Sequence, residues 1–312
     1  MDFIRRAVID VGTNSVKLLV ADVAGNHVVP VREESKQTRL GKDFYETSIL
    51  QAEAIARTAT AVASLAEQAR ASQTSSLRVF ATSAARDAKN PGDLTSAIQA
   101  ATGLTTEIIS GEQEAAWSFQ GVTTEPRFAA GSLLLLDVGG GSTEFILGRD
   151  RQPLLARSFP LGTVRLLEQS PLSDPPTAEQ FAACTEGLRA YLRDQVQPQL
   201  APVLASAALP GPLRLVGTGG TTSLLGRMEL QLATFDRAAI ETVELDLERL
   251  RTLRDELWQL PLARRETLPG LPPNRADVIL TGVAIYTAVM EVFELPRLSI
   301  STRGLRFAAV MG

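Results

Sequence analysis

Three short turns rich in Gly, Ser and Thr follow apolar segments of this chain and have the composition of phosphate-binding loops. They occupy residues 12–15, 139–143 and 217–222. Glycine lets successive backbone amides converge on one anion, and Ser or Thr hydroxyls add further donors. The third turn is expected to lead into a helix, whose N-terminal amides and dipole also favour phosphate. Each turn alone is more typical of a tight structural turn, and none matches the Walker or dinucleotide pattern, but the three together favour a phosphate-containing ligand.

The first two turns belong to a repeated segment. DVGTNS at 10–15 reappears as DVGGGS at 137–142, with each position 127 residues after its counterpart. Both copies follow an apolar run and precede another, so each is interpreted as a strand–turn–strand unit. Two copies of one such unit predict a duplicated fold with a cleft between its halves.

Acidic residues accompany these turns. Asp10 and Asp137 end strands immediately before the first two turns, where carboxylates can hold Mg²⁺ beside bound phosphates; either is also typical of a turn-capping residue. Glu144 lies on the strand after the second turn, where a charge is expected to face a cleft. Glu112 and Glu114 stand at a helix start, where acids stabilise the helix dipole, so spacing alone identifies neither as catalytic.

Basic residues could balance the charge of a polyphosphate. Arg86 follows a predicted strand in a loop of the kind that carries active-site side chains. Lys17, Arg39 and Arg165 are further candidates, with a solvated surface cation as the alternative interpretation, particularly for Arg39 and Arg165.

The composition limits the classes of protein that this chain could be. Its 312 residues, 45% of them hydrophobic, suggest about two globular domains. A single cysteine, Cys184, and a single histidine, His27 in a predicted hairpin turn, exclude an internal disulfide and a His/Cys zinc site. A net charge of −4 does not favour a nucleic-acid or acidic-membrane binder, and no apolar run is long enough to span a bilayer. With no secretory signal at the start, a reducing, cytoplasmic location is expected.

Strand-like and helix-like segments alternate along the chain, which predicts α/β layers. Strands are predicted at 8–10, 16–20, 28–31, 77–81, 106–109, 133–137, 143–147, 213–216 and 297–300. Helices are predicted at 47–70, 93–101, after Gly111, from about Thr177, at 245–258 and 274–293, and from Arg303. The first helix carries the capping-box pattern Ser48-x-x-Gln51. Pro-rich stretches at 171–176, 198–212 and 269–273 are interpreted as loops.

Taken in order, the motifs resemble those of the exopolyphosphatase and guanosine pentaphosphate phosphatase family. The resemblance covers nearly the whole chain, and the ordered set is specific although single motifs are not. The motifs are AVIDVGTNSVKLLV (7–20), TRLG (38–41), ATSAAR (81–86), ISGEQEA (109–115), LDVGGGSTEFILG (136–148), LGTVRL (161–166), GTGGT (217–221), RADVI (275–279) and STRGL (301–305).

This resemblance implies an α/β fold of the actin-like, sugar-kinase-like (ribonuclease H-like) type. Such a fold is a duplicated two-domain structure with an interdomain active-site cleft. By analogy the first domain comprises residues 1–125 plus 300–312, because the last strand and helix return to it, and the second comprises 126–299.

The resemblance also implies hydrolysis of the terminal phosphate of linear polyphosphate or of guanosine pentaphosphate by Mg²⁺-assisted attack of water, with Mn²⁺ as a substitute metal. Glu114 corresponds to the family's water-activating glutamate, and Arg86 to an arginine that balances developing charge. Asp10, Asp137 and Glu144 correspond to metal-binding acids. The implied phosphate-binding residues are Asn14, Ser15, Lys17, Gly140, Gly141, Ser142, Thr143, Gly219, Gly220 and Thr221.

Two departures from the family pattern qualify these expectations. Gln113 stands where many members have a second glutamate, which leaves Glu114 as the better base. The chain stops at Gly312, where longer members continue into helical domains, so the short form is expected, with a preference either for short polyphosphates or for a phosphorylated nucleotide. Family members often form homodimers, and the sequence leaves the oligomeric state open.

Two other functions stay open at this point. One is a polyphosphate or alarmone sensor that binds without cutting, which the retention of Glu114, Asp137 and Glu144 disfavours. The other is an ATP-dependent kinase of the same superfamily, which would need an adenosine-binding loop and an acceptor pocket with its own catalytic aspartate. The segments 81–86 and 110–115 favour the hydrolase.

Overall fold

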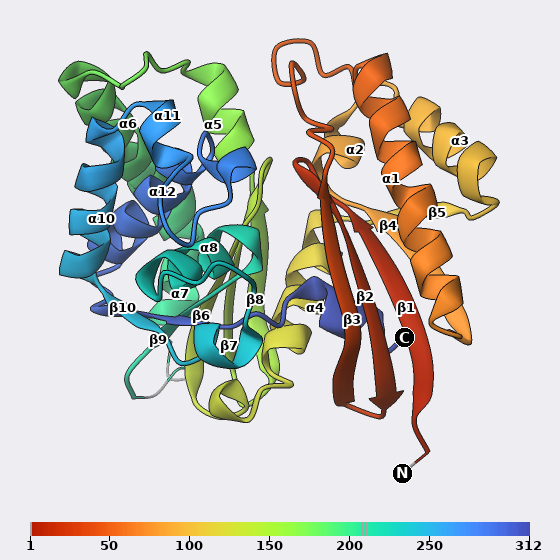
Figure 1. The fold of residues 1–312 in the computed structure, drawn as a ribbon. Coiled ribbons are helices and arrows are strands. Elements are labelled where there is room, and N and C mark those ends of the chain that lie inside the picture. The colour runs from red at the N-terminus through yellow and green to blue at the C-terminus, as the bar shows by residue number, and fades with distance from the viewer. Residues whose placement is uncertain (1, 207–208, 210) are drawn as a thin grey trace. The chain divides into compact units, whose positions relative to one another are not determined.

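The computed structural model describes residues 2–206, 209 and 211–312, and these form two compact units (Figure 1). Unit 1 comprises the chain up to Thr124 together with Arg303–Gly312. Unit 2 comprises Glu125–Thr302. The first unit is therefore assembled from two separate stretches of sequence. The last helix returns to it as expected, but the expectation that the last strand does so is wrong, because the strand over Arg297–Ile300 pairs with residues 215–217 of unit 2.

Unit 1 is built on a five-stranded sheet with the order β3-β2-β1-β4-β5. Its strands are β1 (Ile4–Val11), β2 (Ser15–Ala24), β3 (His27–Gln37), β4 (Ser76–Ala81) and β5 (Thr106–Ile108). The first three form an antiparallel meander, and β4 and β5 continue the sheet in parallel with β1. The hairpin turn predicted over residues 25–28 is confirmed at residues 25–26, whereas His27, predicted to lie in the turn, is the first residue of β3.

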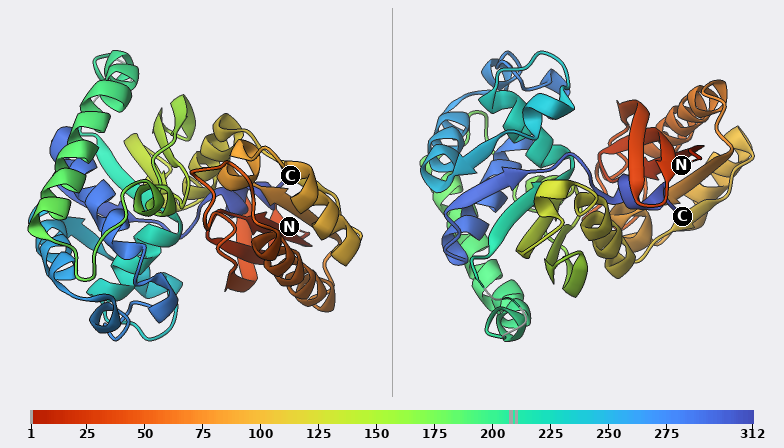
Figure 2. Two further views of the ribbon diagram at one scale, coloured as in Figure 1. Left: turned by 90° about the horizontal axis from the view of Figure 1, so that it is seen from above. Right: turned by 90° about the horizontal axis from the view of Figure 1, so that it is seen from below.

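Helices cover both faces of this sheet (Figures 1 and 2). They are α1 (Ala52–Ala71), α2 (Ser83–Asp87), α3 (Pro91–Thr102), α4 (Gly111–Val122) and α13 (Leu305–Ala309). Residues of α1 and α3 pack against Ile9 and Leu18 on one face. Trp117 of α4 and Phe307 of α13 pack against Val8 on the other. Because side chains alternate along a strand, Asp10 lies on the second face, with Val8 and α4.

Unit 2 is built on a six-stranded sheet with the order β10-β11-β9-β6-β7-β8. Its strands are β6 (Ser132–Val138), β7 (Thr143–Arg149), β8 (Gln152–Phe159), β9 (Arg214–Thr218), β10 (Glu244–Asp246) and β11 (Arg297–Ile300). The three strands β6, β7 and β8 form an antiparallel meander, and β9 and β11 run parallel to β6. This is the order found in unit 1 with one added edge strand, β10. The duplicated, actin-like α/β architecture is thereby confirmed.

The core of unit 2 lies between this sheet and a layer of helices. The helices are α5 (Thr163–Gln169), α6 (Ala178–Tyr191), α7 (Gln197–Leu204), α8 (Gly219–Glu229), α9 (Arg237–Ile240), α10 (Leu247–Gln259), α11 (Leu262–Arg265) and α12 (Ile279–Val292). Leu134, Leu136 and Phe145 of the sheet share one apolar cluster with α12. By strand alternation Asp137 and Glu144 lie on the opposite face.

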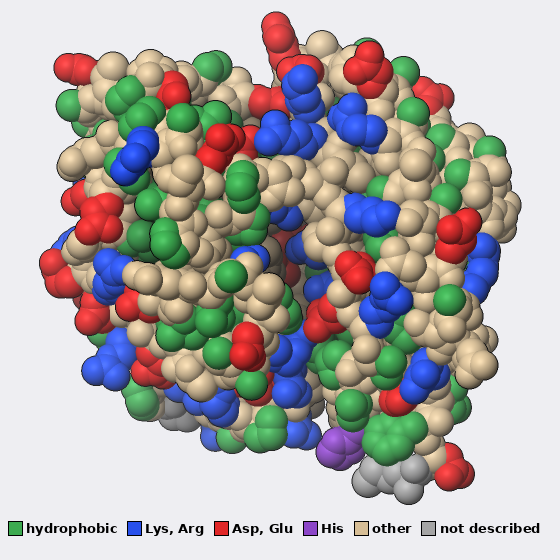
Figure 3. All heavy atoms as spheres, viewed as in Figure 1, with side chains coloured by type: hydrophobic (Ala, Val, Ile, Leu, Met, Phe, Trp, Pro, Cys, Tyr) green, Lys and Arg blue, Asp and Glu red, His purple; other side chains and the backbone are tan. Residues whose placement is uncertain are grey.

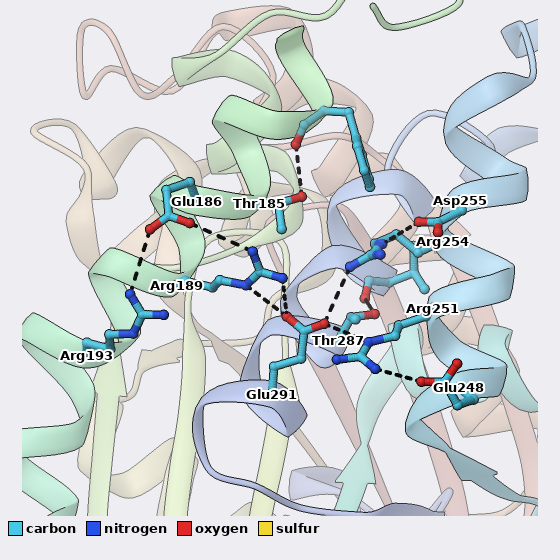
Figure 4. Close-up of polar contacts among 12 residues, drawn as sticks. Thr185, Glu186, Arg189, Arg193, Glu248, Arg251, Arg254, Asp255, Thr287 and Glu291 are labelled. Atoms are coloured by element: carbon cyan, nitrogen blue, oxygen red, sulfur yellow. Dashed lines mark hydrogen bonds and ion pairs between the residues drawn. The ribbon is translucent and has the colours of Figure 1, made fainter. Parts of the chain in front are cut away.

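An ion network ties three of these helices together (Figure 4). The carboxylate of Glu291 on α12 accepts hydrogen bonds from Arg189 of α6 at 2.7 Å and from Arg251 of α10 at 2.9 Å. Burial raises the pKa of Glu291, but the hydrogen bonds from the two arginines outweigh it and leave this pKa below its usual value. No helix among the residues described combines the length and apolarity needed to cross a bilayer.

Two predicted helix starts are wrong. The first helix begins at Ala52 rather than at residue 47, and Gln51 precedes it without a side-chain cap. Ser48 cannot act as the cap because it adopts a positive φ of 59° and its amide bonds to Phe44 O at 2.7 Å. The helix predicted from residue 274 begins at Ile279, after a separate 3₁₀ turn over Pro273–Arg275.

The Pro-rich stretch 198–212 is only partly a loop. Residues up to Leu204 belong to α7, which follows a π-helical turn over Leu192–Val196. Pro198 is tolerated in the first turn of this helix, where a missing amide costs little. Positions 207–208 and 210 of the same stretch lie outside the described residues.

Candidate functional site

The two repeated turns have the same backbone geometry. In unit 1 the amide of Gly12 donates to Ser15 O at 3.0 Å, and in unit 2 the amide of Gly139 donates to Ser142 O at 2.9 Å. A Cβ on either glycine would lie 3.1 Å from that same carbonyl oxygen. The sequence repeat is therefore also a repeat of local structure.

The carbonyl groups of the unit 1 turn are bonded to the segment that follows β3. Gly41 donates its amide to Thr13 O at 2.8 Å, and Thr38 and Arg39 donate theirs to Asn14 O at 3.1 and 3.0 Å. Carbonyl oxygens repel anions, so their engagement by protein donors favours a turn that presents amides to a phosphate.

The unit 2 turn is supported in the same way by the start of α5. Thr163 donates its amide to Gly139 O at 3.0 Å, and Val164 donates to Gly140 O at 2.9 Å. The Arg165 side chain donates through Nε to Gly141 O at 2.7 Å. Arg165, a candidate phosphate cation in the sequence, therefore uses one guanidinium donor to hold the turn itself.

A row of polar residues crosses four strands of the unit 2 sheet. In order across the sheet, the row consists of Thr218 on β9, Asp137 on β6, Glu144 on β7 and Ser158 on β8. Each residue is the register partner of the next one in this order. Register partners share a face of the sheet, with Cβ atoms about 5 Å apart in antiparallel pairs. Glu144 is 1% exposed, and its Oε1 accepts hydrogen bonds from Ser142 Oγ at 2.8 Å and Ser158 Oγ at 2.7 Å.

Unit 1 has the equivalent row with a different charge pattern. Its members are Phe80 of β4, Asp10 of β1, Lys17 of β2 and Ser35 of β3. Asp10 corresponds to Asp137 in the repeat, and Lys17 occupies the register position of Glu144. The duplicated frame thus holds two carboxylates in unit 2 but a carboxylate and an ammonium group in unit 1.

The third turn adds the N-terminus of α8 to the polar row of unit 2. Gly219, the first residue of this helix, has a φ of +87°, and Asp137 Oδ1 occupies the space that a Cβ there would need. The Thr221 hydroxyl donates to Val138 O at 3.0 Å, which ties this turn to the end of β6. Within unit 2, Gly219 and Thr221 therefore lie beside the strand end that carries Asp137.

Buried hydroxyl groups lie beneath this site. The Tyr286 hydroxyl hydrogen-bonds with Thr222 and donates to Leu136 O at 3.5 Å. Full burial, with the charge of Asp137 as a further contribution, raises the pKa of Tyr286 well above its usual value. Tyr286 therefore stays protonated at neutral pH and acts as a neutral support.

In unit 1 a partly buried ion pair joins Arg86 to Glu114. Glu114, 8% exposed on α4, accepts a hydrogen bond through Oε2 from Arg86 Nη1 at 2.9 Å, and the same nitrogen donates to Ile109 O at 3.2 Å. The side chain of Ser110 caps α4 by accepting the Gln113 amide at 3.1 Å. The two residues that the resemblance assigns to catalysis are therefore in contact.

Surface charge is mixed on the face of each unit that Figure 3 draws. The face drawn in Figure 3 interleaves Lys and Arg with Asp and Glu on unit 1 and, separately, on unit 2. We therefore expect anions to be bound by amides and side chains at the turns rather than attracted by a positive electrostatic potential over the whole surface.

The chain also matches a known phosphatase family along most of its length. The profile of the Ppx/GppA phosphatase family matches residues 19–311. The chain belongs to this family. It is 34% identical over 300 residues to Exopolyphosphatase 2 of Mycobacterium tuberculosis. This alignment covers 91% of this chain and 89% of that protein.

Further relatives extend the match along the chain. Exopolyphosphatase 1 of M. tuberculosis is 29% identical over 309 residues, with 98% of this chain and 87% of that protein covered. The crystal structure of the Aquifex aeolicus Ppx/GppA family member matches with a TM-score of 0.78 and 28% identity over 99% of this chain and 97% of that one.

The donor set of this Ppx/GppA chain fits a divalent cation in unit 2. No three Asp, Glu, His or Cys side chains gather within the described part of the chain, but Mg²⁺ commonly takes one or two carboxylates plus substrate phosphates and waters. Asp137 and Glu144 supply such a pair. No described atom hydrogen-bonds to the buried Oγ1 of Thr218, the register partner of Asp137 on β9. Asp10 has Lys17 as its cross-strand neighbour, so a cation there would meet an ammonium group.

Each unit carries its own share of the sequence-derived candidates. Unit 1 holds Asp10, Asn14, Ser15, Lys17, Arg86 and Glu114. Unit 2 holds Asp137, Gly140, Gly141, Ser142, Thr143, Glu144, Gly219, Gly220 and Thr221.

Sequence reasoning missed two members of the unit 2 row. Thr218 ends a strand directly before a Gly-rich turn. The same position relative to a turn identified Asp10 and Asp137 in the sequence, and it could have identified Thr218 as well. Ser158 lies on β8, a strand that was not predicted, because QPLLARSF has no regular alternation.

Proposed function

We propose that this Ppx/GppA family member is an exopolyphosphatase that removes terminal phosphate from linear inorganic polyphosphate. Water attacks the terminal phosphorus, the bond from that phosphorus to the bridging oxygen breaks, and orthophosphate and a shortened chain leave. The water proton passes to a protein base, and the bridging oxygen leaves on the shortened chain.

The observation that carries the proposal is the carboxylate pair Asp137 and Glu144 on neighbouring strands beside a phosphate-type turn. The amides of the turn at 139–143 and of the α8 N-terminus suit phosphate oxygens. The names of the M. tuberculosis relatives, both exopolyphosphatases, support the same substrate class.

The residues of unit 1 would act on the water and on the phosphate charge. Glu114 would orient the attacking water and accept its proton, and Arg86 holds the Glu114 carboxylate at 2.9 Å and would balance developing charge. Asn14, Ser15 and Lys17 would bind phosphate oxygens.

In unit 2, Asp137 and Glu144 would hold Mg²⁺, with Mn²⁺ as a substitute. The metal would neutralise phosphate charge as the bond breaks. The glycines and hydroxyls at 140–143 and 219–221 would fix the phosphates in one orientation. Asp10 is retained as a candidate for the metal or for a phosphate-bound water.

The finer properties rest on the family resemblance. We propose short polyphosphates as preferred substrates, guanosine pentaphosphate as a second substrate, a cytoplasmic location, and a homodimer as an accessible state. Light scattering measures the last of these directly.

The first experiment is phosphate release by the purified full chain with and without Mg²⁺. The substrates are short polyphosphate, long polyphosphate, guanosine pentaphosphate and ATP. Stepwise release of orthophosphate from polyphosphate supports the proposal, and the ratio to guanosine pentaphosphate assigns the preference. Tight binding of polyphosphate with no release from any substrate would replace the hydrolase with a sensor, and ATP-dependent transfer to an acceptor would replace it with a kinase.

A further inference from the structure

Ser158 hydrogen-bonds to the carboxylate of Glu144, which lies 14 residues earlier in the chain, in the motif at 136–148. Its hydroxyl donates to Glu144 Oε1 at 2.7 Å from β8, which forms one edge of the unit 2 sheet. Ser142, in the turn before β7, donates to the same oxygen at 2.8 Å. Two hydroxyls, one from the turn before β7 and one from the neighbouring strand β8, thus meet on one carboxylate oxygen.

This arrangement fixes the rotation of the Glu144 carboxylate. A glutamate carboxyl group rotates readily about its last torsion, and that rotation decides where its second oxygen points. Two donors on Oε1 restrict this torsion, and the 1% exposure of Glu144 excludes competing solvent. The second oxygen is thereby held in one direction, and Ser158 contributes to this from a strand that carries none of the proposed phosphate-binding residues.

We infer that Ser158 is a positioning residue that orients Glu144 for a divalent cation. The inference rests on the proposed function, because it concerns the same metal. Partners that hydrogen-bond to a metal ligand typically change metal affinity or activity by about 10–100-fold when they are removed.

The duplicate unit provides a matched control. Ser35 stands opposite Lys17 on β3 as Ser158 stands opposite Glu144 on β8. Both serines lie on the edge strand of their sheet. In unit 1 this edge strand is β3, which pairs with β2, and in unit 2 it is β8, which pairs with the corresponding strand β7. Ser35 faces an ammonium group rather than a carboxylate, so the same substitution there removes a hydroxyl without disturbing a metal ligand.

The test compares Ser158→Ala, Ser158→Thr and Ser35→Ala in the full chain. Direct Mn²⁺ binding is measured by calorimetry without substrate, and the Mg²⁺ dependence of polyphosphate hydrolysis is measured in parallel. Ser158→Ala should weaken Mn²⁺ binding by about tenfold and raise the half-saturating Mg²⁺ concentration by a similar factor. Ser158→Thr, which keeps the hydroxyl, should restore both values, and Ser35→Ala should match the parent.

Each other outcome has a definite meaning. Unchanged Mn²⁺ binding in Ser158→Ala overturns the inference, and so does an equal loss in Ser158→Thr, because packing rather than the hydroxyl would then be responsible. If Ser158→Ala does not fold, the Thr variant and the parent decide the point: weaker Mn²⁺ binding in a folded Thr variant overturns the inference, and equal binding supports it. A parent chain that neither binds Mn²⁺ nor responds to Mg²⁺ overturns the metal site itself, and this is recognised before any variant is compared.

Discussion

Asp137 Oδ1 occupies the space that a side chain on Gly219 would need. The carboxylate lies one residue before the end of β6 and the glycine begins α8, so the strand and the helix approach each other at a point where only hydrogen fits. The positive φ of Gly219, +87°, adds a second reason for glycine at this position.

Gly219→Ala should therefore abolish most activity by displacing Asp137. The control is Gly103→Ala, which shares a positive φ of 72° but would meet no atom within 4 Å. Backbone strain should cost both variants about 1–2 kcal/mol of unfolding free energy. Thermal unfolding and phosphate release measure the two effects, and equal activity in both variants would contradict the role given to this contact.

Glu114→Gln should lower polyphosphate hydrolysis by about 10²–10⁴-fold, because the amide cannot accept the proton of the attacking water. Binding of polyphosphate, measured with the inactive variant, should persist. Glu112→Gln is the matched control, since it makes the same change two residues away at an exposed position in the first turn of α4. Full activity in Glu114→Gln would remove this residue from the mechanism.

The repeated aspartates should respond differently to the same substitution. Asp137→Asn should raise the half-saturating Mg²⁺ concentration by at least about tenfold, because Glu144 on the neighbouring strand then lacks its partner. Asp10→Asn, with Lys17 opposite, should change the KM for polyphosphate more than the metal requirement. Titration of activity with Mg²⁺ at fixed substrate separates the two, and a reversed order would move the metal to unit 1.

Glu291→Gln should destabilise unit 2 by about 1–2 kcal/mol, because Arg189 and Arg251 lose a charged partner but are exposed enough for water to replace part of it. Glu248→Gln removes a carboxylate that is 80% exposed from the same Arg251 and should cost less than about 1 kcal/mol. Chemical denaturation monitored separately for each unit provides the comparison.

The effect of Glu291 should also depend on pH with a defined sign. Its pKa is lower in the folded chain than its ordinary value of 4.5, so the stabilisation is complete above that value. It should decline as the pH falls below 4.5 towards the lower pKa of the folded state. A difference between the parent and Glu291→Gln that grows on acidification would contradict this assignment.

The sequence predicted the parts of the fold that local pattern determines. Consecutive leucines at 133–136 before Asp137 identified β6, and the repeat identified its counterpart, β1. The start of α1 was wrong because a tertiary contact competes with the local cap: Asn90 Oδ1 accepts the Leu50 amide at 2.9 Å from 40 residues away. Ser158 was missed for the same kind of reason, since only the pairing of β8 with β7 brings it to Glu144.

Unit 1 depends on residues 303–312 for part of its packing. Phe307 covers the sheet face that carries Val8 and Phe80, and Arg306 donates to Leu18 O at 2.8 Å. These residues are translated after all of unit 2. The sheet of unit 1 therefore leaves the ribosome first, and the apolar face that Phe307 covers stays exposed until unit 2 has been synthesised. A C-terminal truncation or a fusion that disturbs residues 303–312 would therefore expose the earliest part of the nascent protein to aggregation and to chaperones while sparing the unit made last.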